Sequence, residues 1–363
     1  MLPIYGIPFT STIILRPLSL RNTSLLVFTA KTCYNRKTDI VKGERKMDRK
    51  PYGLVLCGGG GKGAYQIGVW KALRELHMDG WIQSVSGSSA GALNAMLFLN
   101  GDYAAAEHVW TSIRPIQFLD IEPEGYCSRE GILKLMNREL NLQHLSESTL
   151  PTYLSVTHAA PALHSENNRF DSAMASLNQD PSERTGEYLL VNGRSAEDIQ
   201  KILLASTAIP LVYDPVEIDG QLYRDGGLFD NVPIRPHLET GIKNLIIVRC
   251  SPNQQCDPYL LSQADSLLEI APSADIGSLL TGTLDFDGRN AMYRLQLGYF
   301  DTLRTVEYYD RKMLGYPPSE AEKRTRIAQD YERAKSVSRI AGHMDDVNRN
   351  KSKIDSIMKK YGL

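Results

Sequence analysis

Apolar runs and helix-like patterns alternate along most of the chain. The run 52–57 (YGLVLC) ends in a glycine cluster, which is typical of a buried strand. Apolar residues then recur every three positions from Ile67 to Leu76, the spacing of one helix face. Residues 81–86 (WIQSVS) predict a second strand, and the almost wholly apolar stretch 92–99 predicts a buried helix. Strand, helix, strand and helix in this order predict parallel pairing through right-handed crossovers.

The same patterns continue through the rest of the chain. Helical periodicity predicts helices at 102–113, 129–140 and 195–206, and apolar runs predict strands at 152–159, 187–192 and 244–250. Residues 216–227 predict a hairpin that turns at Asp219-Gly220. Beyond about residue 310 the chain is mixed in charge and helix-prone, and Pro317-Pro318 marks a break. The prediction is an α/β fold with a mostly parallel central sheet and a helical C-terminal region.

The composition is that of an ordinary globular protein, because 42% of the 363 residues are hydrophobic and 23% are charged. The net charge of −1 gives no reason to expect a nucleic-acid partner. No apolar run reaches about 18 residues, so we expect no transmembrane helix. The cysteines form no CxxC pair, which argues against a disulfide framework or a metal site and favours a reducing, cytoplasmic location. There are five of them: Cys33, Cys57, Cys127, Cys250 and Cys256.

The first 46 residues differ from the rest, with eight Lys/Arg against two Asp/Glu and no clear helical or strand period. Such a basic segment fits either a targeting sequence or an unstructured extension. We expect the second, a disordered extension over 1–46. The remaining chain divides into a core at 50–250, a helical continuation packed on it at 251–316 and a charged helical tail at 317–363.

Four consecutive glycines, Gly58 to Gly61, are followed by Lys62 and Gly63 between the first strand and its helix. Backbone N–H groups at such a helix start favour an anion. A dinucleotide site needs a carboxylate at the end of the second strand, and a P-loop needs Lys and Ser/Thr after Gly63; the sequence has neither. A tight turn without a ligand explains only one or two of the glycines. These absences make a nucleotide less favoured without removing it, and the third candidate is the oxyanion of a tetrahedral intermediate, which predicts a nucleophile nearby.

The segment GSSAG (87–91) supplies a candidate nucleophile. It is a G-x-S-x-G pattern with Ser89 at its centre, between the second predicted strand and the apolar helix. Gly87 and Gly91 leave room for the sharp turn that projects the serine from the edge of the sheet. The alternative is an ordinary turn in which Ser88 or Ser89 caps the helix.

A serine hydroxyl needs a base to act as a nucleophile. Of the seven histidines, only His237 is a candidate, and a lone histidine in a predicted helix more often has a packing role. Asp225 is a better candidate, because Gly226 and Gly227 let the backbone turn away and leave its carboxylate facing the serine. Asp-Gly-Gly is also a common turn, so this motif alone leaves a structural role open.

Taken together, these residues resemble the patatin-like phospholipases. The resemblance covers roughly residues 50–250 and rests on four motifs in the family's order and spacing. They are GGGGKG (58–63), GSSAG (87–91) followed by ALNA, ASTAIP (205–210) and DGGLFDNVP (225–233). The family often has DGA where this chain has DGG, a change that keeps the carboxylate. The resemblance implies a three-layer α/β/α fold, with 50–250 as its catalytic core, and a Ser–Asp dyad that needs no metal or cofactor.

The resemblance also implies the roles of single residues. Ser89 becomes the acyl-accepting nucleophile, and Asp225 the base that takes its proton with no histidine between them. Lys62 would anchor the loop or meet an anionic head group. Oxyanion donors would come from the glycine loop: Gly58, Gly59, Gly60 and Gly61. The other motif residues would support this geometry: Gly63, Gly87, Gly91, Gly226, Gly227, Asn231 and Pro233.

The implied activity is hydrolysis of fatty acyl esters through an acyl-enzyme, of the phospholipase A or esterase type. Its substrate would be a phospholipid or another acyl-ester lipid, with peripheral contact at a membrane surface. Three alternatives stay open: an acyltransferase of the same fold, a nucleotide-binding module that uses the glycine loop, and a lipid-binding protein without activity. Residues 290–309 are amphipathic and aromatic, which fits a membrane-docking helix or, more simply, a helix packed on the domain.

Overall fold

The computed structural model describes residues 50–114, 127–160 and 169–361. All of them belong to one compact unit, so the expected core, continuation and tail are parts of a single body. The expected disordered extension at 1–46 lies outside the described residues and stays a prediction.

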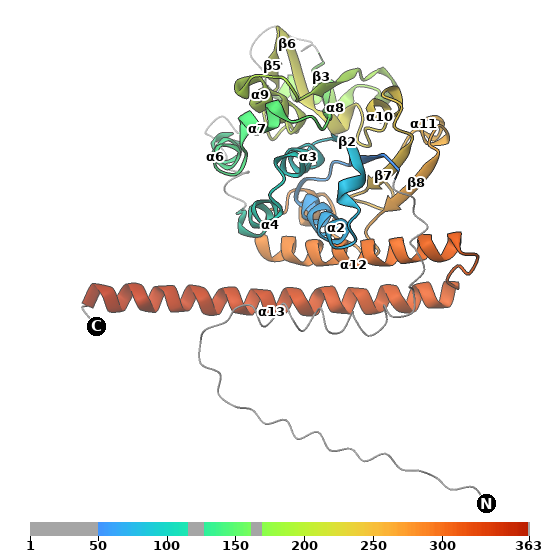
Figure 1. Cartoon of the computed structure of the whole chain (residues 1–363). Helices are drawn as coiled ribbons and strands as arrows, with labels where there is room; N and C mark the ends of the chain where they lie inside the picture. The colour runs from blue at the N-terminus through green and yellow to red at the C-terminus, as the bar shows by residue number, and fades with distance from the viewer. Residues whose placement is uncertain (1–49, 115–126, 161–168, 362–363) are drawn as a thin grey trace, which may run out of the picture. The chain divides into compact units, whose positions relative to one another are not determined.

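One mixed sheet forms the centre of the described part of the chain, with eight strands (Figure 1). The strands are β1 (Tyr52–Leu56), β2 (Ile82–Gly87), β3 (Thr152–His158), β4 (Gly186–Leu190), β5 (Val216–Ile218), β6 (Gln221–Asp225), β7 (Asn244–Val248) and β8 (Ser266–Ile270). Their order is β5-β6-β3-β2-β1-β7-β8, and β4 also pairs with β3. Strands β3, β2, β1, β7 and β8 pair with one another in parallel, whereas the antiparallel pairs are β3 with β4, β3 with β6 and β5 with β6. The mostly parallel sheet predicted from the sequence is confirmed.

Helices connect and follow these strands. They are α2 (Ala64–Glu75), α3 (Ala90–Asn100), α4 (Tyr103–Ser112), α6 (Glu130–Glu139), α7 (Leu142–Glu147), α8 (Arg169–Asn178), α9 (Ala196–Ser206), α10 (Arg235–Glu239), α11 (Pro258–Ser262), α12 (Gly288–Met313) and α13 (Glu320–Tyr361). The hairpin predicted at 216–227 is present as β5 and β6, and Asp219 and Gly220 both adopt positive φ at its turn. The sequence patterns missed β8, which adds a strand to the sheet within the segment expected to be helical, 251–316.

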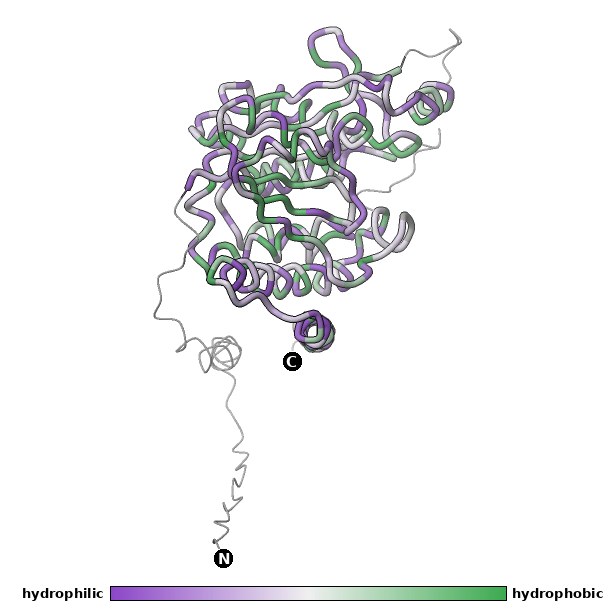
Figure 2. Tube along the Cα trace, turned by 90° about the vertical axis from the view of Figure 1, so that its right-hand side faces the viewer, coloured by the Kyte–Doolittle hydropathy of each residue, from purple (hydrophilic) through white to green (hydrophobic). Residues whose placement is uncertain are grey.

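Both faces of the sheet are covered, as the alternation of side chains along β1 shows. Leu54 and Leu56 belong to a large core shared with α2, α3, α9 and α12. Val55 and Cys57 point the other way, into a smaller core with residues of 232–234 and α11. The most hydrophobic segments run through the middle of the trace (Figure 2). Sheet and two helical covers make up the expected three-layer α/β/α arrangement.

Helix α12 packs directly on α2, backbone against backbone. A Cβ at Gly68 would lie 1.8 Å from the carbonyl oxygen of Leu295, and one at Gly298 would lie 2.1 Å from that of Tyr65. Leu295 and Leu297 are fully buried in this contact region. The simpler interpretation of residues 290–309, a helix packed on the domain, is therefore confirmed. Helix α13 lies alongside α12 (Figure 1), and buried Arg304 of α12 bonds to Asp330 of α13 at 2.6 Å.

The register along β3 decides where two strand ends meet. β2 runs parallel to β3 and ends with Gly87 opposite Leu154, whereas β6 runs antiparallel and ends with Asp225 opposite Val156. Strand β4 pairs with both Leu154 and Val156, so it occupies the other edge of β3. β2 and β6 therefore approach each other end to end along one edge, and their carboxyl ends converge near Ser155.

Candidate active site

Ser89 lies in a strained turn between β2 and α3. Its φ is 53° and its ψ is −121°, a conformation that costs on the order of 1–3 kcal/mol for a residue with a side chain. Two glycines make the turn sterically possible. A Cβ on Gly87 would lie 2.3 Å from the carbonyl oxygen of Gly91, and one on Gly91 would lie 2.0 Å from that of Leu56. The sharp strand-to-helix turn predicted from the G-x-S-x-G pattern is present.

Asp225 is held beside this turn by its own backbone. Its N–H donates to the carbonyl of Ala208 at 3.0 Å, and its carbonyl accepts from the Thr157 hydroxyl at 2.7 Å. The backbone then turns away at Gly226, where a Cβ would lie 2.0 Å from the carbonyl oxygen of Ser155. The Asp225 side chain is left in the gap between the two strand ends, on the side of Ser89.

The Asp225 carboxyl is buried, and burial raises its pKa from the ordinary value to about 6. The Ser89 hydroxyl and the Gly227 N–H act in the opposite direction. Oδ1 accepts from the Gly227 N–H at 2.9 Å, whereas Oδ2 is buried with no hydrogen-bond partner in the part of the chain that the structure describes. The Ser89 hydroxyl is thus close enough to lower the pKa of the carboxyl. One carboxylate oxygen is left open beside the serine.

Close contacts with other parts of the protein leave no room for a side chain at most positions of the glycine loop. A Cβ at Gly59 would lie 2.5 Å from the Cβ of Cys250, and one at Gly60 would lie 2.0 Å from the carbonyl oxygen of Thr283. At Gly61 it would lie 1.9 Å from the carbonyl oxygen of Asp285. These approaches correct the expectation that a turn without a ligand explains only one or two of the glycines.

One backbone N–H group of this loop donates a hydrogen bond, and three do not. The Gly58 N–H donates to Asn231 Oδ1 at 3.0 Å. The N–H groups of Gly59, Gly60 and Gly61 donate to no acceptor among the described residues. The loop lies beside the serine, since a Cβ on Gly58 would lie 3.1 Å from the Cβ of Ser89. Of the four expected oxyanion donors, Gly58 is therefore already engaged, and its three successors keep free N–H groups.

Lys62 and Gly63 connect this loop to its surroundings. The Lys62 stem packs on Gly282, where a Cβ would lie 2.5 Å from the lysine Cε. Gly63 lies against the Trp110 ring, and a Cβ on this glycine would lie 2.7 Å from two carbons at the ring edge. The Trp110 indole N–H donates to Asn94 Oδ1 at 2.7 Å, and the Asn94 amide donates to the Gly63 carbonyl at 2.9 Å. These buried bonds fix the end of the loop and one pocket wall together.

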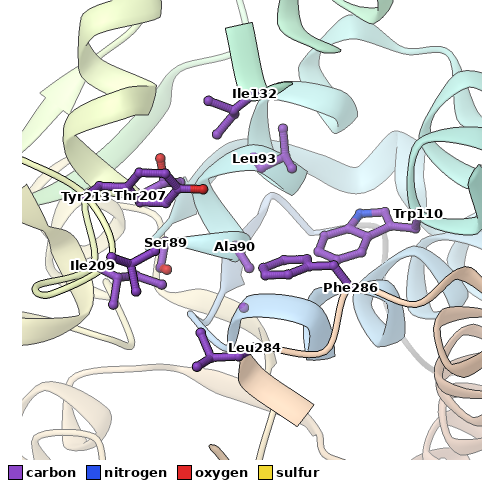
Figure 3. A pocket seen from close by; sticks show the side chains of 12 residues that line it. Ser89, Ala90, Leu93, Trp110, Ile132, Thr207, Ile209, Tyr213, Leu284 and Phe286 are labelled. Atoms are coloured by element: carbon purple, nitrogen blue, oxygen red, sulfur yellow. The ribbon is translucent and has the colours of Figure 1, made fainter. Parts of the chain in front are cut away.

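An apolar pocket opens next to Ser89 (Figure 3). It encloses about 490 Å³ of space, counted out to its open mouth. Aromatic and aliphatic side chains from distant parts of the chain line most of it: Ala90, Leu93, Trp110, Ile132, Ile209, Val212, Tyr213, Leu284 and Phe286, with Gly60, Ser89 and Thr207. Ser89 is the lining residue whose hydroxyl lies beside the Asp225 carboxyl.

His237 has the packing role that its sequence setting suggested. It is fully buried in α10, and its Nε2 lies 2.8 Å from the Ser86 hydroxyl. Burial lowers its pKa to about 3, so the ring is neutral at ordinary pH. Within the described ranges, no group of three His, Cys, Asp or Glu side chains could hold a metal ion. None of the described helices combines the length and apolar character needed to cross a bilayer.

Several supports of the site escaped the sequence analysis. Ser206, within the ASTAIP motif, accepts the Ser89 N–H at 3.2 Å, a link across 117 positions. Leu284 and Phe286 reach the pocket from beyond the region of resemblance. The motif ASTAIP gave a signal for Ser206, but no local pattern marks Leu284 or Phe286, because their role depends on long-range packing alone.

The family model of the patatin-like phospholipases matches residues 54–238, about half of the chain. The lysophospholipase NTE1 of Cryptococcus neoformans is 23% identical over 231 residues, which are 58% of this chain and 12% of that protein. The uncharacterized protein YjjU of Escherichia coli K12 is 28% identical over 205 residues, 55% of this chain and 52% of that protein. The chain thus spans about half of the bacterial relative and a small part of the fungal one.

Among solved structures, VipD of Legionella pneumophila aligns with a TM-score of 0.37 at 15% identity. The alignment covers 88% of this chain and 85% of that one.

The buried carboxyl predicts that Asp225→Asn stabilises the protein at pH 7.5 but not at pH 4. The folded protein binds this proton more tightly than the unfolded chain does, because the pKa is near 6 in the folded state and near 4 in the unfolded one. Protonation therefore contributes its full free energy to folding below about pH 4, and this contribution is lost as the pH rises through 6. The asparagine has no such charge, so its gain at pH 7.5 should reach about 3 kcal/mol at most. Thermal unfolding of both proteins between pH 4 and pH 8 measures this. A stability difference that does not change with pH would contradict the assignment of a raised pKa.

Proposed function

This chain belongs to the patatin-like phospholipase family, whose model spans half of it, and from that premise we propose that it is a serine hydrolase of lipid acyl esters. One observation carries the proposal. Ser89 and Gly60 line one apolar pocket, the Asp225 carboxyl with its open Oδ2 lies beside Ser89, and the N–H groups of Gly59 to Gly61 are free of acceptors among the described residues. A nucleophile, a base, oxyanion donors and a place for an acyl chain are the parts that this reaction needs.

In the first step, the Ser89 oxygen attacks the ester carbonyl carbon while Asp225 accepts the hydroxyl proton. Negative charge develops on the carbonyl oxygen, and the glycine N–H groups stabilise it; one such donor is typically worth about 10²–10³ in rate. The intermediate then collapses, the bond to the leaving oxygen breaks, and Asp225 returns the proton to that oxygen. The products of this step are an alcohol or lysophospholipid and an acyl-Ser89 ester.

In the second step, water attacks the acyl-enzyme. Asp225 accepts a proton from the water as its oxygen bonds to the acyl carbon, and the same N–H groups hold the second oxyanion. Collapse breaks the bond to Ser89, which recovers the proton from Asp225, and the fatty acid leaves. The same two residues thus act in both halves of the cycle, and no histidine takes part.

Burial suits Asp225 to this role. A carboxylate with an ordinary pKa is a weak base, whereas one with a pKa of about 6 binds a proton more strongly and is still about nine-tenths ionised at pH 7. Positioned general bases of this kind typically contribute about 10²–10⁴ in rate.

The pocket supports a fatty acyl chain as the group transferred. Its walls carry aliphatic and aromatic side chains, so an alkyl chain would gain about 0.8 kcal/mol for each CH₂ removed from water. The fungal relative is named a lysophospholipase, which supports a phospholipid or lysophospholipid as the lipid class. Leu211 lies in the sequence between Ile209 and Val212, which both line the pocket, and it is 41% exposed. Its apolar side chain is therefore available for peripheral contact with a lipid surface.

The proposal predicts that Ser89→Ala lowers hydrolysis of p-nitrophenyl butyrate by roughly 10³-fold or more, because the nucleophile is lost. Ser88→Ala is the matched control. Ser88 is the preceding residue, is also buried, and its hydroxyl has no hydrogen-bond partner among the described residues. It should keep activity within a few-fold of the wild type. Residual turnover by Ser89→Ala at the level of Ser88→Ala would refute the assignment.

The pocket predicts a chain-length effect for Ile132→Phe, which adds bulk to a lining position of α6. Turnover of p-nitrophenyl decanoate should fall at least tenfold relative to p-nitrophenyl acetate, because about 1.4 kcal/mol of lost contact corresponds to that factor. The ratio of the two rates within one preparation does not depend on the fraction of folded protein. An unchanged ratio would mean that the acyl chain lies elsewhere.

A further inference from the structure

We propose that Arg294 of helix α12 is a positioning residue that holds the glycine loop in the conformation the oxyanion requires. The inference rests on the proposed function and extends the site beyond residues 54–238, which the family model matches. It concerns three parts of the chain: Arg294, the glycine loop 58–61 and the segment 276–286.

The Arg294 guanidinium is buried, with 3% of the residue exposed, and all three of its nitrogens donate hydrogen bonds. Nη1 donates to the carbonyl of Gly61 at 3.2 Å and to that of Asp285 at 3.0 Å. Nη2 donates to the Thr281 carbonyl at 2.8 Å and to Asp285 Oδ2 at 2.7 Å, and Nε donates to the Ile276 carbonyl at 3.2 Å. One planar group therefore ties the glycine loop to several points of the segment 276–286.

The bond to Gly61 acts on the peptide group that closes the loop. The oxygen of this peptide accepts from Arg294, and its N–H, which belongs to Lys62, donates to the Gly59 carbonyl at 3.2 Å. The peptide is thus held at both ends. Glycines have no side chains with which to fix their own conformation, and Gly60 adopts a φ of +56°, so the loop depends on such outside contacts.

The segment 276–286 supports the same loop from behind. The carbonyls of Thr283 and Asp285 lie so close to Gly60 and Gly61 that no Cβ would fit. This segment also sends Leu284 and Phe286 into the pocket (Figure 3). Arg294 therefore holds both the backing of the oxyanion donors and one wall of the pocket.

A lysine at this position would not reproduce the arrangement. Its ammonium is a single point with three donors, whereas the bonds to Gly61, Asp285 and Ile276 leave Arg294 in diverging directions from a rigid plane. Arg294→Lys keeps the charge beside Asp285 and loses part of the hold on the glycine loop. It tests positioning rather than charge.

Arg304 offers a matched control on the same helix. It is also buried, with 5% exposed, and it pairs with Asp301 and Asp330 in the contact between α12 and α13. None of the hydrogen bonds formed by its described side chain goes to the glycine loop. Arg304→Lys should therefore cost stability without changing the site.

The experiment compares Arg294→Lys and Arg304→Lys in the full chain by thermal unfolding, by kcat and KM for p-nitrophenyl butyrate, and by amide hydrogen exchange. We expect kcat of Arg294→Lys to fall about 10²-fold, the worth of one oxyanion donor, with KM within about threefold of the wild type. The hydrogen-bonded amides of Gly58 and Lys62 should exchange faster in this variant only. Arg304→Lys should lower Tm, because lysine cannot keep both buried ion pairs, and leave kcat within about threefold.

The proposal is overturned if Arg294→Lys loses no more kcat than Arg304→Lys, or if exchange at Gly58 and Lys62 is the same in both. If Arg294→Lys does not fold, Asp285→Asn removes the ion pair at 2.7 Å, at the cost of one acceptor in a carboxylate that also binds Asn290 and the Asp287 N–H, and it should shift the same two readouts in the same direction. A wild-type protein that hydrolyses no ester would end the proposed function, and the exchange measurement would still decide whether Arg294 holds the loop.

Discussion

The site depends on the pairing of β2 and β6 with the same edge of β3, which brings the carboxyl ends of these two strands together. Neither β2 nor β6 alone carries a complete site: one ends before Ser89 and the other ends at Asp225, 136 positions later. The register of their pairing with β3 brings the two ends together at Ser155, and Gly226 lets the backbone after β6 pass close to the Ser155 carbonyl of β3. A slip of one residue in either pairing would turn the side chains to the opposite face of the sheet.

The site is assembled from features that each oppose stability. A serine at positive φ, a buried carboxyl with one open oxygen and three glycine N–H groups without acceptors among the described residues would all be removed in a sequence selected for stability alone. They persist because the surroundings determine them: the Ser89 N–H bonds to Ser206, the Asp225 backbone to Ala208, and the glycine loop is backed by Thr283 and Asp285. Strain and open polar groups gathered at one place are what a preorganised active site looks like.

The sequence predicted the parts of the site that have local signatures. The turn around Ser89 and the Asp-Gly-Gly after β6 are short motifs with definite neighbours, and the helix 64–75 and strand β1 follow from plain periodicity. Strand β8 was missed because it is only partly buried, whereas β1 and β7, which are equally short, are buried throughout. The reason for the glycines was also missed, because Gly60 meets Thr283 across more than 220 positions, and no local pattern records such a contact. The role of Arg294 was missed as well. It lies in an amphipathic helix, and the sequence does not show which of the polar side chains of that helix is buried.

The most direct test of the central claim is the pH dependence of the rate at which a fluorophosphonate labels Ser89. With Asp225 as the base, labelling of the wild type should rise with pH, with an apparent pKa near 6, and then level off. Asp225→Asn should react slowly and without that inflection. Equal labelling profiles for the two proteins, or an adduct on another residue, would contradict the account of a Ser89–Asp225 pair.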